Sequence, residues 1–220
     1  MVPARNDMVV LTGHGIGMPP SWMRDVDLEM WITQEQFESA LQIISPEVHL
    51  TFDDGFSCCW EIAFPELRNR GLSARFFVLA GMLGKQGYVE PEQLVEMSSE
   101  GMTIGTHGMY HRPWRKLSKS MLYEEIAEAK DRLECLLGKP VTEAACPFGA
   151  YDRRTLHALK RSGIQRVYTS DRAIPAPNSW IIPRYTIRRS DSEKYVEEVA
   201  RGLHDASLIG RAKMFVKRFR

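Results

Sequence analysis

The chain has no long hydrophobic run. Its first apolar stretch extends only from Met8 to Leu11, which is shorter than the apolar core of a secretory leader. No other stretch approaches the roughly 20 apolar residues that a membrane-spanning helix requires. These absences predict a cytoplasmic protein without membrane-spanning segments.

A surplus of charge is also missing, and cysteine is scarce. The formal net charge of +1 lacks the basic excess typical of proteins that bind nucleic-acid backbones. The spacing of the four cysteines matches neither a zinc-binding nor a disulfide framework. The sequence therefore predicts no nucleic-acid partner, and cysteines that serve as small buried side chains in a reducing compartment.

One local charge bias lies in the last ten residues, which we expect to form a basic C-terminal tail over 211–220. Apolar residues such as Phe215 and Phe219 alternate there with five basic ones: Arg211, Lys213, Lys217, Arg218 and Arg220. This pattern fits a solvated terminal helix. It also fits a patch that contacts an anionic membrane surface, here the inner face.

Seven short β-rich runs alternate with helical patterns along the rest of the chain. Thr33 with Gln36 fits a capping box, Asp152 fits a helix N-cap and Gly138 fits a helix end. Strands that alternate with helices form mostly parallel sheets, so the pattern predicts a barrel or a doubly wound sheet. We find no linker or repeat and expect one domain over residues 1–210. The β-rich runs lie near residues 8–12, 47–52, 74–79, 102–106, 142–146, 165–169 and 181–187.

Polar residues directly follow several of these predicted strands. His14 follows the first run, Asp53 and Asp54 follow the second in TFDDG, and His107 and His111 follow the fourth in HGMYH. The carboxyl ends of parallel strands meet at one rim, where functional residues gather. We therefore expect these side chains to lie together despite their separation in sequence.

One carboxylate with two imidazoles makes a three-ligand set for a divalent metal, with a position open for water. The same ligand types suit zinc and non-haem iron(II), so they do not select the metal. The adjacent second aspartate favours hydrolysis. An attacking water needs a neighbouring base, whereas a redox metal does not.

The motifs TFDDG, HGMYH and PFG followed by YD resemble those of the polysaccharide deacetylases, which share the NodB homology domain and include the carbohydrate esterases of family 4. The resemblance extends over residues 8–190. It implies a distorted (β/α) barrel of about seven parallel strands with helices outside. It also implies a hydrolase that uses a divalent metal, with zinc preferred over cobalt, nickel, manganese or iron, to remove N-acetyl groups from amino sugars. By position, Asp53 is the catalytic base and the metal ligands are Asp54, His107 and His111.

The chain departs from this family pattern in three places. Gly108 stands where a serine or threonine normally braces the histidine loop, and Ala145 stands where the third motif normally has an arginine. No Leu-x-His motif ends the last strand, where many members keep a general-acid histidine. His204 lies near that end of the chain, but its segment resembles a helix.

Two residues are candidates for the missing roles. The matrix poly-N-acetylglucosamine deacetylases carry their acid histidine on the first strand, and LTGHGIG resembles that segment. The resemblance therefore assigns His14 as the general acid, with the backbone N–H of Phe148 holding the oxyanion. Arg184 in IPRYT is the candidate for the missing arginine, and we group it with the residues on the substrate side.

Aromatic residues near the motifs are candidates for substrate contacts. Tyr110 and Trp114 flank the histidine motif, and Trp180 precedes the last strand. Sugar rings stack on such faces, although core packing explains most tryptophans. Without an export signal, the expected substrate is an N-acetylated saccharide in the form of a lipid-linked or nucleotide-linked precursor of an exopolysaccharide.

Two other functions stay open at this stage. An amidase acting on another small formyl or cyclic amide would use the same motifs, because these describe the chemistry rather than the pocket. The departures at Gly108 and Ala145 are also what a non-catalytic binding protein with a degenerate site would show.

Overall fold

The structure is a computed structural model that describes residues 9–45, 48–204 and 208–219. Eight strands form one sheet in the order β10-β1-β4-β5-β6-β7-β8-β9, and each neighbouring pair is parallel. Their bounds are β1 Val9–Gly13, β4 Val48–Phe52, β5 Ala74–Val78, β6 Thr103–Thr106, β7 Glu143–Ala145, β8 Arg166–Thr169, β9 Ile181–Pro183 and β10 Tyr185–Thr186. Two further short strands, β2 (Gly15–Ile16) and β3 (Trp31–Ile32), pair only with each other.

The last β-segment closes the sheet on itself. Only Arg184 separates β9 from β10, yet β9 pairs with β8 at one end of the sheet and β10 pairs with β1 at the other. One continuous stretch of chain therefore joins both edges, which removes the exposed edge strands of an open sheet. The predicted (β/α) barrel is confirmed, and its seventh run is the segment that divides into β9 and β10.

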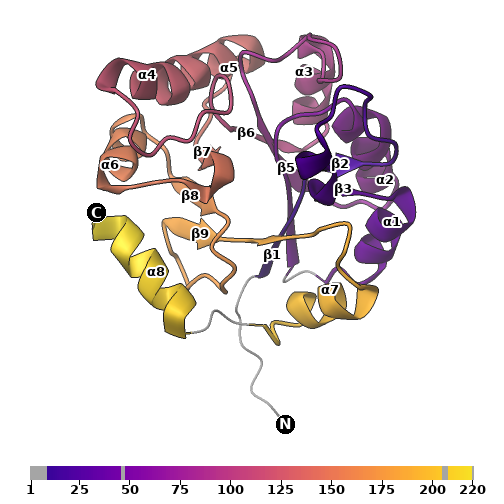
Figure 1. Ribbon diagram of the computed structural model, residues 1–220. Helices are drawn as coiled ribbons and strands as arrows, with labels where there is room; N and C mark the ends of the chain where they lie inside the picture. Colours follow the sequence, from indigo (N-terminus) through magenta and orange to yellow (C-terminus); the bar gives the residue numbers. More distant parts are fainter. Residues whose placement is uncertain (1–8, 46–47, 205–207, 220) are drawn as a thin grey trace.

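The helices lie around the outside of the sheet (Figure 1). Local chemistry sets their ends: Thr33 and Gln36 form the predicted capping box, Asp152 accepts from the amide of Thr155, and Gly138 ends a helix at φ 63°. Their bounds are α1 Gln34–Gln42, α2 Phe64–Asn69, α3 Pro91–Ser99, α4 Lys119–Tyr123, α5 Ala129–Leu137, α6 Arg153–Arg161, α7 Glu193–Ala200 and α8 Leu208–Phe219.

The strands separate two apolar layers, because successive side chains point to opposite faces. On β1, Leu11 belongs to the large outer core beneath the helices, while its neighbour Val10 belongs to a small inner cluster. That inner cluster takes one residue from each of five strands: Val10, Phe77, Ala145, Tyr168 and Ile182. It fills the middle of the barrel, so polar residues on the same faces are confined to its two ends.

At the amino ends of the strands the polar side chains satisfy one another. Glu143 accepts from Arg75 Nε at 2.9 Å and from Arg166 Nη1 at 3.1 Å. A second nitrogen of Arg75 lies 3.2 Å from His49 Nδ1. Burial, with Arg75 and Arg166 close by, lowers the pKa of His49 and keeps its ring neutral. The charged side chains at this end of the barrel therefore compensate one another.

Helix α8 contains most of the tail that the sequence predicts over 211–220, although Arg220 lies outside the described residues. Lys217 is turned toward the barrel, where its Nζ reaches the carboxylate of Asp171 and the carbonyl of Gly149. Phe215, Val216 and Phe219 are exposed instead. No helix in the described parts of the chain combines the length and the apolar character that crossing a membrane would take.

Candidate active site

The side chains of the two adjacent aspartates point in different directions because the backbone turns sharply at the second aspartate and the glycine that follows it. Asp53 continues the inward face of β4, while Asp54 and Gly55 both have left-handed backbones, with φ of 72° and 73°. This conformation costs a non-glycine residue about 1–2 kcal/mol. A Cβ on Gly55 would lie 2.9 Å from Val78, so the glycine of the DDG motif is needed for space as well. The strained turn therefore lets the two carboxylates contact different partners.

Asp53 is held by Arg184. The guanidinium donates two hydrogen bonds to the carboxylate, at 2.7 and 2.6 Å, and both side chains are almost fully buried. Burial alone would raise the pKa of Asp53, but the charge of Arg184 prevails and holds this pKa well below its usual range. Arg184 also donates to Thr51 and lies over the rings of Phe77 and Tyr168. It thus orients an ionised Asp53, and does not line the pocket as a substrate residue would.

Asp54, His107 and His111 meet beside this pair. Asp54 Oδ1 lies 3.6 Å from His107 Nε2 and 3.4 Å from His111 Nε2. Tetrahedral zinc bonded to nitrogen and oxygen at its usual bond lengths has ligand atoms about 3.3 Å apart. Asp54 Oδ1 is buried without a hydrogen-bond partner among the described residues. A buried carboxylate oxygen of this kind is what a cation would satisfy, so the three residues fit a divalent metal.

Protonation states agree with this fit. His107 Nδ1 lies 2.9 Å from the carbonyl oxygen of Ala145, which can only accept, so Nδ1 carries the proton and Nε2 is free to ligate. Burial lowers the pKa of His107 to about 3 and also lowers that of His111. Burial raises the pKa of Asp54 to about 6, a shift that a bound cation would oppose.

The histidine loop is braced by a residue that the sequence analysis did not identify. Glu125 accepts from the backbone N–H groups of Met109 and Tyr110, at 3.2 and 3.0 Å. It is fully buried and lies in a π-helical turn, Glu124–Glu128, a geometry frequent at functional sites. Gly108 has φ 97°, and a Cβ there would come within 2.4 Å of Glu125 Oε2. The glycine in place of serine or threonine therefore makes room for a different brace.

Trp114 belongs to this brace and not to the pocket, which corrects the substrate contact expected from the sequence. Its side chain is only 1% exposed, and its indole N–H points to Glu125 Oε2 at 3.4 Å. Trp180 packs into the same apolar cluster and donates to the carbonyl of Ile164. His204 pairs with Glu198, away from the residues that line the pocket. All three of these side chains serve packing or surface contacts.

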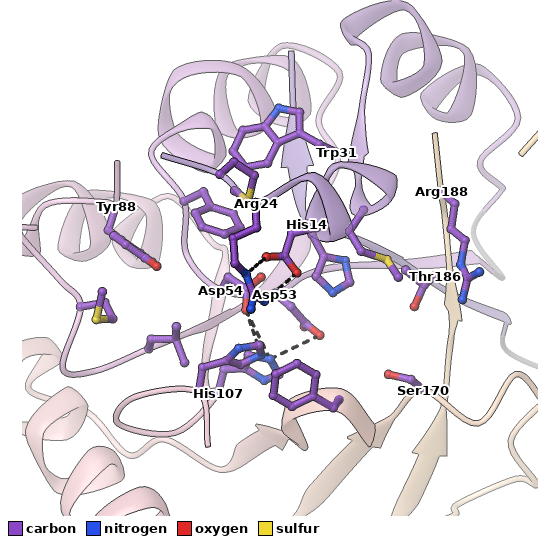
Figure 2. Close-up of a pocket in the computed structure, with 18 of the residues that line it drawn as sticks. His14, Arg24, Trp31, Asp53, Asp54, Tyr88, His107, Ser170, Thr186 and Arg188 are labelled. Atoms are coloured by element: carbon purple, nitrogen blue, oxygen red, sulfur yellow. Dashed lines mark hydrogen bonds and ion pairs between the residues drawn. The ribbon is translucent and has the colours of Figure 1, made fainter. Parts of the chain in front are cut away.

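The metal-ligand set opens into a cavity of about 550 Å³. His14 lines it beside the two aspartates, as Figure 2 shows, and its Nδ1 has no partner among the described residues. Tyr110 lines the same cavity and is 44% exposed. Phe148 also lines it, with φ 56° and its ring 4.4 Å from that of His111. The structure thus brings the predicted acid, base, ligands and oxyanion residue to one rim.

An aromatic wall faces this rim and was not expected from the sequence. It is built largely by the excursion between β1 and α1, which contains β2 and β3, together with the loop that leads to α3. Trp22 and Tyr88 stack at 6.1 Å, and Trp31 and Phe56 lie 5.0 Å apart. The sequence signal was the density of aromatic residues in WMRDVDLEMW, which carried no motif.

Comparison with known proteins identifies the scaffold. The family model for polysaccharide deacetylase matches residues 44–167, which is more than half of the chain. The protein belongs to the polysaccharide deacetylase family. The poly-β-1,6-N-acetyl-D-glucosamine N-deacetylase of Staphylococcus aureus (strain MRSA252) is 24% identical over 184 residues, which cover 76% of this chain and 63% of that protein. YxkH of Bacillus subtilis is 28% identical over 124 residues, or 56% of this chain and 44% of the relative. The chain thus spans roughly half to two thirds of these relatives.

Solved structures share the fold. The Streptococcus pyogenes deacetylase PplD, in complex with acetate, superposes with a TM-score of 0.77 at 22% identity, covering 88% of this chain and 98% of the other. IcaB from Ammonifex degensii gives a TM-score of 0.71 at 23% identity, with 88% and 97% covered. At these identities the likeness concerns the barrel, and the roles of individual residues depend on the geometry described above.

Proposed function

We propose that the protein is a metal-dependent deacetylase that hydrolyses the N-acetyl group of an amino sugar in a saccharide. The observation that carries the proposal is the pairing of two sites: an unsatisfied Asp54 oxygen between two neutral imidazoles, and an ionised Asp53 directly beside it. Family membership supports hydrolysis, and the Staphylococcus aureus relatives act on poly-β-1,6-N-acetyl-D-glucosamine.

Each catalytic residue would have one role. A divalent ion held by Asp54, His107 and His111, zinc in the first place, would supply Lewis acidity toward the amide carbonyl and lower the pKa of water. Asp53 accepts the proton of the attacking water, and Arg184 keeps it ionised and oriented for that purpose. The backbone N–H of Phe148 donates to the carbonyl oxygen as negative charge develops there.

His14 completes the reaction by giving a proton to the departing sugar amine, which would otherwise be a poor leaving group. It lines the pocket next to both aspartates. Acid and base residues of this kind each contribute about 10²–10⁴ in rate.

Metal content and acetate release, measured together, test the proposal. We expect Asp53→Asn to keep one divalent ion per chain and to lower kcat on N-acetylated oligosaccharides by about 10²–10⁴. His107→Ala should lose the ion as well as the activity, and Asp131→Asn, at an exposed acid of α5, should change neither. Near-normal turnover of Asp53→Asn would contradict the assignment. A wild type that takes up neither zinc nor cobalt would favour the binding-protein alternative.

The form of the substrate that we propose is a lipid-linked or nucleotide-linked precursor, with the enzyme in the cytoplasm at the inner membrane face. The exposed apolar residues of α8 and its basic flank, which includes Arg218, support contact with anionic lipid. Phe215→Ser with Phe219→Ser should abolish flotation with anionic vesicles, while Met121→Ser, at an exposed apolar residue of α4, should not. Equal, negligible flotation of all the proteins would end the membrane proposal.

A further inference from the structure

The pocket is lined by as many arginines as aspartates, but these groups do not pair with one another one to one. Three carboxylates line it, and each is accounted for: Asp27 pairs with Arg24 at 2.8 Å, Asp53 pairs with Arg184, and Asp54 belongs to the metal-ligand set. The lining also contains two more arginines, Arg172 and Arg188. Among the residues that the structure describes, neither lies within ion-pair distance of a carboxylate. The pocket therefore contains two guanidinium groups with no acid assigned to them.

The guanidinium of Arg188 has a buried N–H group that a ligand could satisfy. Its Nε is buried and has no hydrogen-bond partner in the described part of the protein. The nearest acid in sequence, Asp191, is turned to the backbone, since it accepts from the amide of Arg188 at 2.9 Å. A buried donor without an acceptor costs free energy, and an anion in the pocket would satisfy it.

Arg172 lines the same pocket as Arg188 but follows a different strand. It follows β8 in the left-handed region, at φ 50°, and its amide donates to the carbonyl of Arg184 at 3.1 Å. Ser170 and Thr186 line the same pocket, and among the described residues neither hydroxyl has a side-chain hydrogen-bond partner. Figure 2 shows Arg188, Thr186 and Ser170 on one side of the pocket and Tyr88 on the other, with Asp53, Asp54 and His107 between them.

We propose that Ser170, Arg172, Thr186 and Arg188 form a phosphate-binding subsite, and that the substrate is an N-acetylated amino sugar carrying a phosphate or diphosphate. Two guanidinium groups with two hydroxyls offer more donors than one carboxylate can use, and they suit the several oxygens of a phosphate. Ser170, Thr186 and Arg188 lie on the opposite side of the catalytic residues from Tyr88 of the aromatic wall. This inference rests on the proposed function, because it names the substrate class for the same pocket.

Competing substrates test the subsite. The zinc-loaded enzyme would be assayed for deacetylation of N-acetylglucosamine 1-phosphate, of the corresponding nucleoside diphosphate sugar, and of neutral diacetylchitobiose. We expect a preference for the phosphorylated sugars. The double variant Arg172→Gln with Arg188→Gln should lower kcat/KM for them by about 10- to 100-fold and lower neutral turnover far less, so that the ratio of phosphorylated to neutral turnover falls. Arg132→Gln, at an exposed arginine of α5, serves as the matched control.

A binding measurement keeps this test separate from the proposed function. N-Acetylglucosamine 1-phosphate would be titrated calorimetrically into the wild type and the double variant, with and without zinc. Weaker binding by the variant under both conditions supports the subsite even if no sugar is deacetylated, a result that would overturn only the proposed function. Equal binding by the two proteins, or an unchanged ratio of phosphorylated to neutral turnover, overturns the subsite. The two phosphorylated substrates distinguish a sugar phosphate from a carrier-linked diphosphate.

Discussion

The two ends of the barrel both contain buried charge, but only one end has charge left unsatisfied. At the amino ends of the strands, Glu143 accepts from Arg75 and Arg166, and the left-handed backbones that precede β5, β6 and β8 belong to glycines, which adopt them without strain. At the carboxyl ends, Asp54 has a buried oxygen without a hydrogen-bond partner among the described residues, and Asp54, His111 and Phe148 all have left-handed backbones. Strain and unsatisfied polarity persist where a ligand compensates them. The comparison teaches that burial of charge alone does not mark an active site, whereas incomplete compensation does.

The largest effect should come from removing Arg184, the cation that compensates Asp53. Arg184→Met leaves the Asp53 carboxylate buried without compensation, and we expect it to lower the free energy of unfolding by about 3–5 kcal/mol at pH 7. Denaturant unfolding measures this change. Arg184 holds the pKa of Asp53 low, so its contribution is present above the unfolded pKa, near 4, and is lost as the pH falls toward the folded pKa. The gap between wild type and variant should therefore narrow below about pH 4.

A second substitution separates lost charge compensation from lost packing. Adding Asp53→Asn to Arg184→Met removes the uncompensated carboxylate, so most of the stability should return although the arginine is still absent. If the double variant is as unstable as the single one, Arg184 acts mainly through packing on Phe77 and Tyr168.

At Asp54 we expect the effect of a substitution on stability to change sign when the metal is bound. Its pKa in the metal-free protein is raised to about 6, so its ionisation costs stability above that pH, and the cost disappears toward pH 4, where the carboxyl is protonated in the folded state. With chelator at pH 7.5, Asp54→Asn should be more stable than the wild type by about 1–3 kcal/mol. With saturating zinc the order should reverse, because only the wild type gains binding energy. A variant that is less stable under both conditions would show that the carboxylate is compensated without a metal.

The smallest effect is expected at the other end of the barrel. Glu143→Gln weakens a network whose outer arginine, Arg166, has a side chain that is 52% exposed, so solvent can replace part of the lost interaction. We expect a loss of about 1–2 kcal/mol in unfolding free energy and no change in metal content or activity. Loss of the metal in this variant would break the distinction between the two ends.

The sequence predicts the position of a site residue well where that residue directly follows a strand. The seven β-rich runs were sufficient to predict a mostly parallel sheet and to bring Asp53, Asp54, His107 and His111 to one rim, whereas the choice of a barrel over a doubly wound sheet came from the family resemblance. Contacts that join distant segments were harder to predict. Glu125 sits next to Ile126 in a helical stripe that resembles an ordinary amphipathic surface, and only the folded loop shows what it accepts. The pair of Arg184 and Asp53 spans 131 positions and no local pattern encodes it, so the sequence offered Arg184 only as a candidate for the missing arginine.

Arg184 lies at the junction where the two sheet edges are joined, so one residue serves both the closure of the barrel and the charge of Asp53. In a chain whose final segment has not docked, the ring of strands is open and the Asp53 carboxylate lacks its arginine partner. Closure of the ring and compensation of Asp53 could be followed as a single event during refolding.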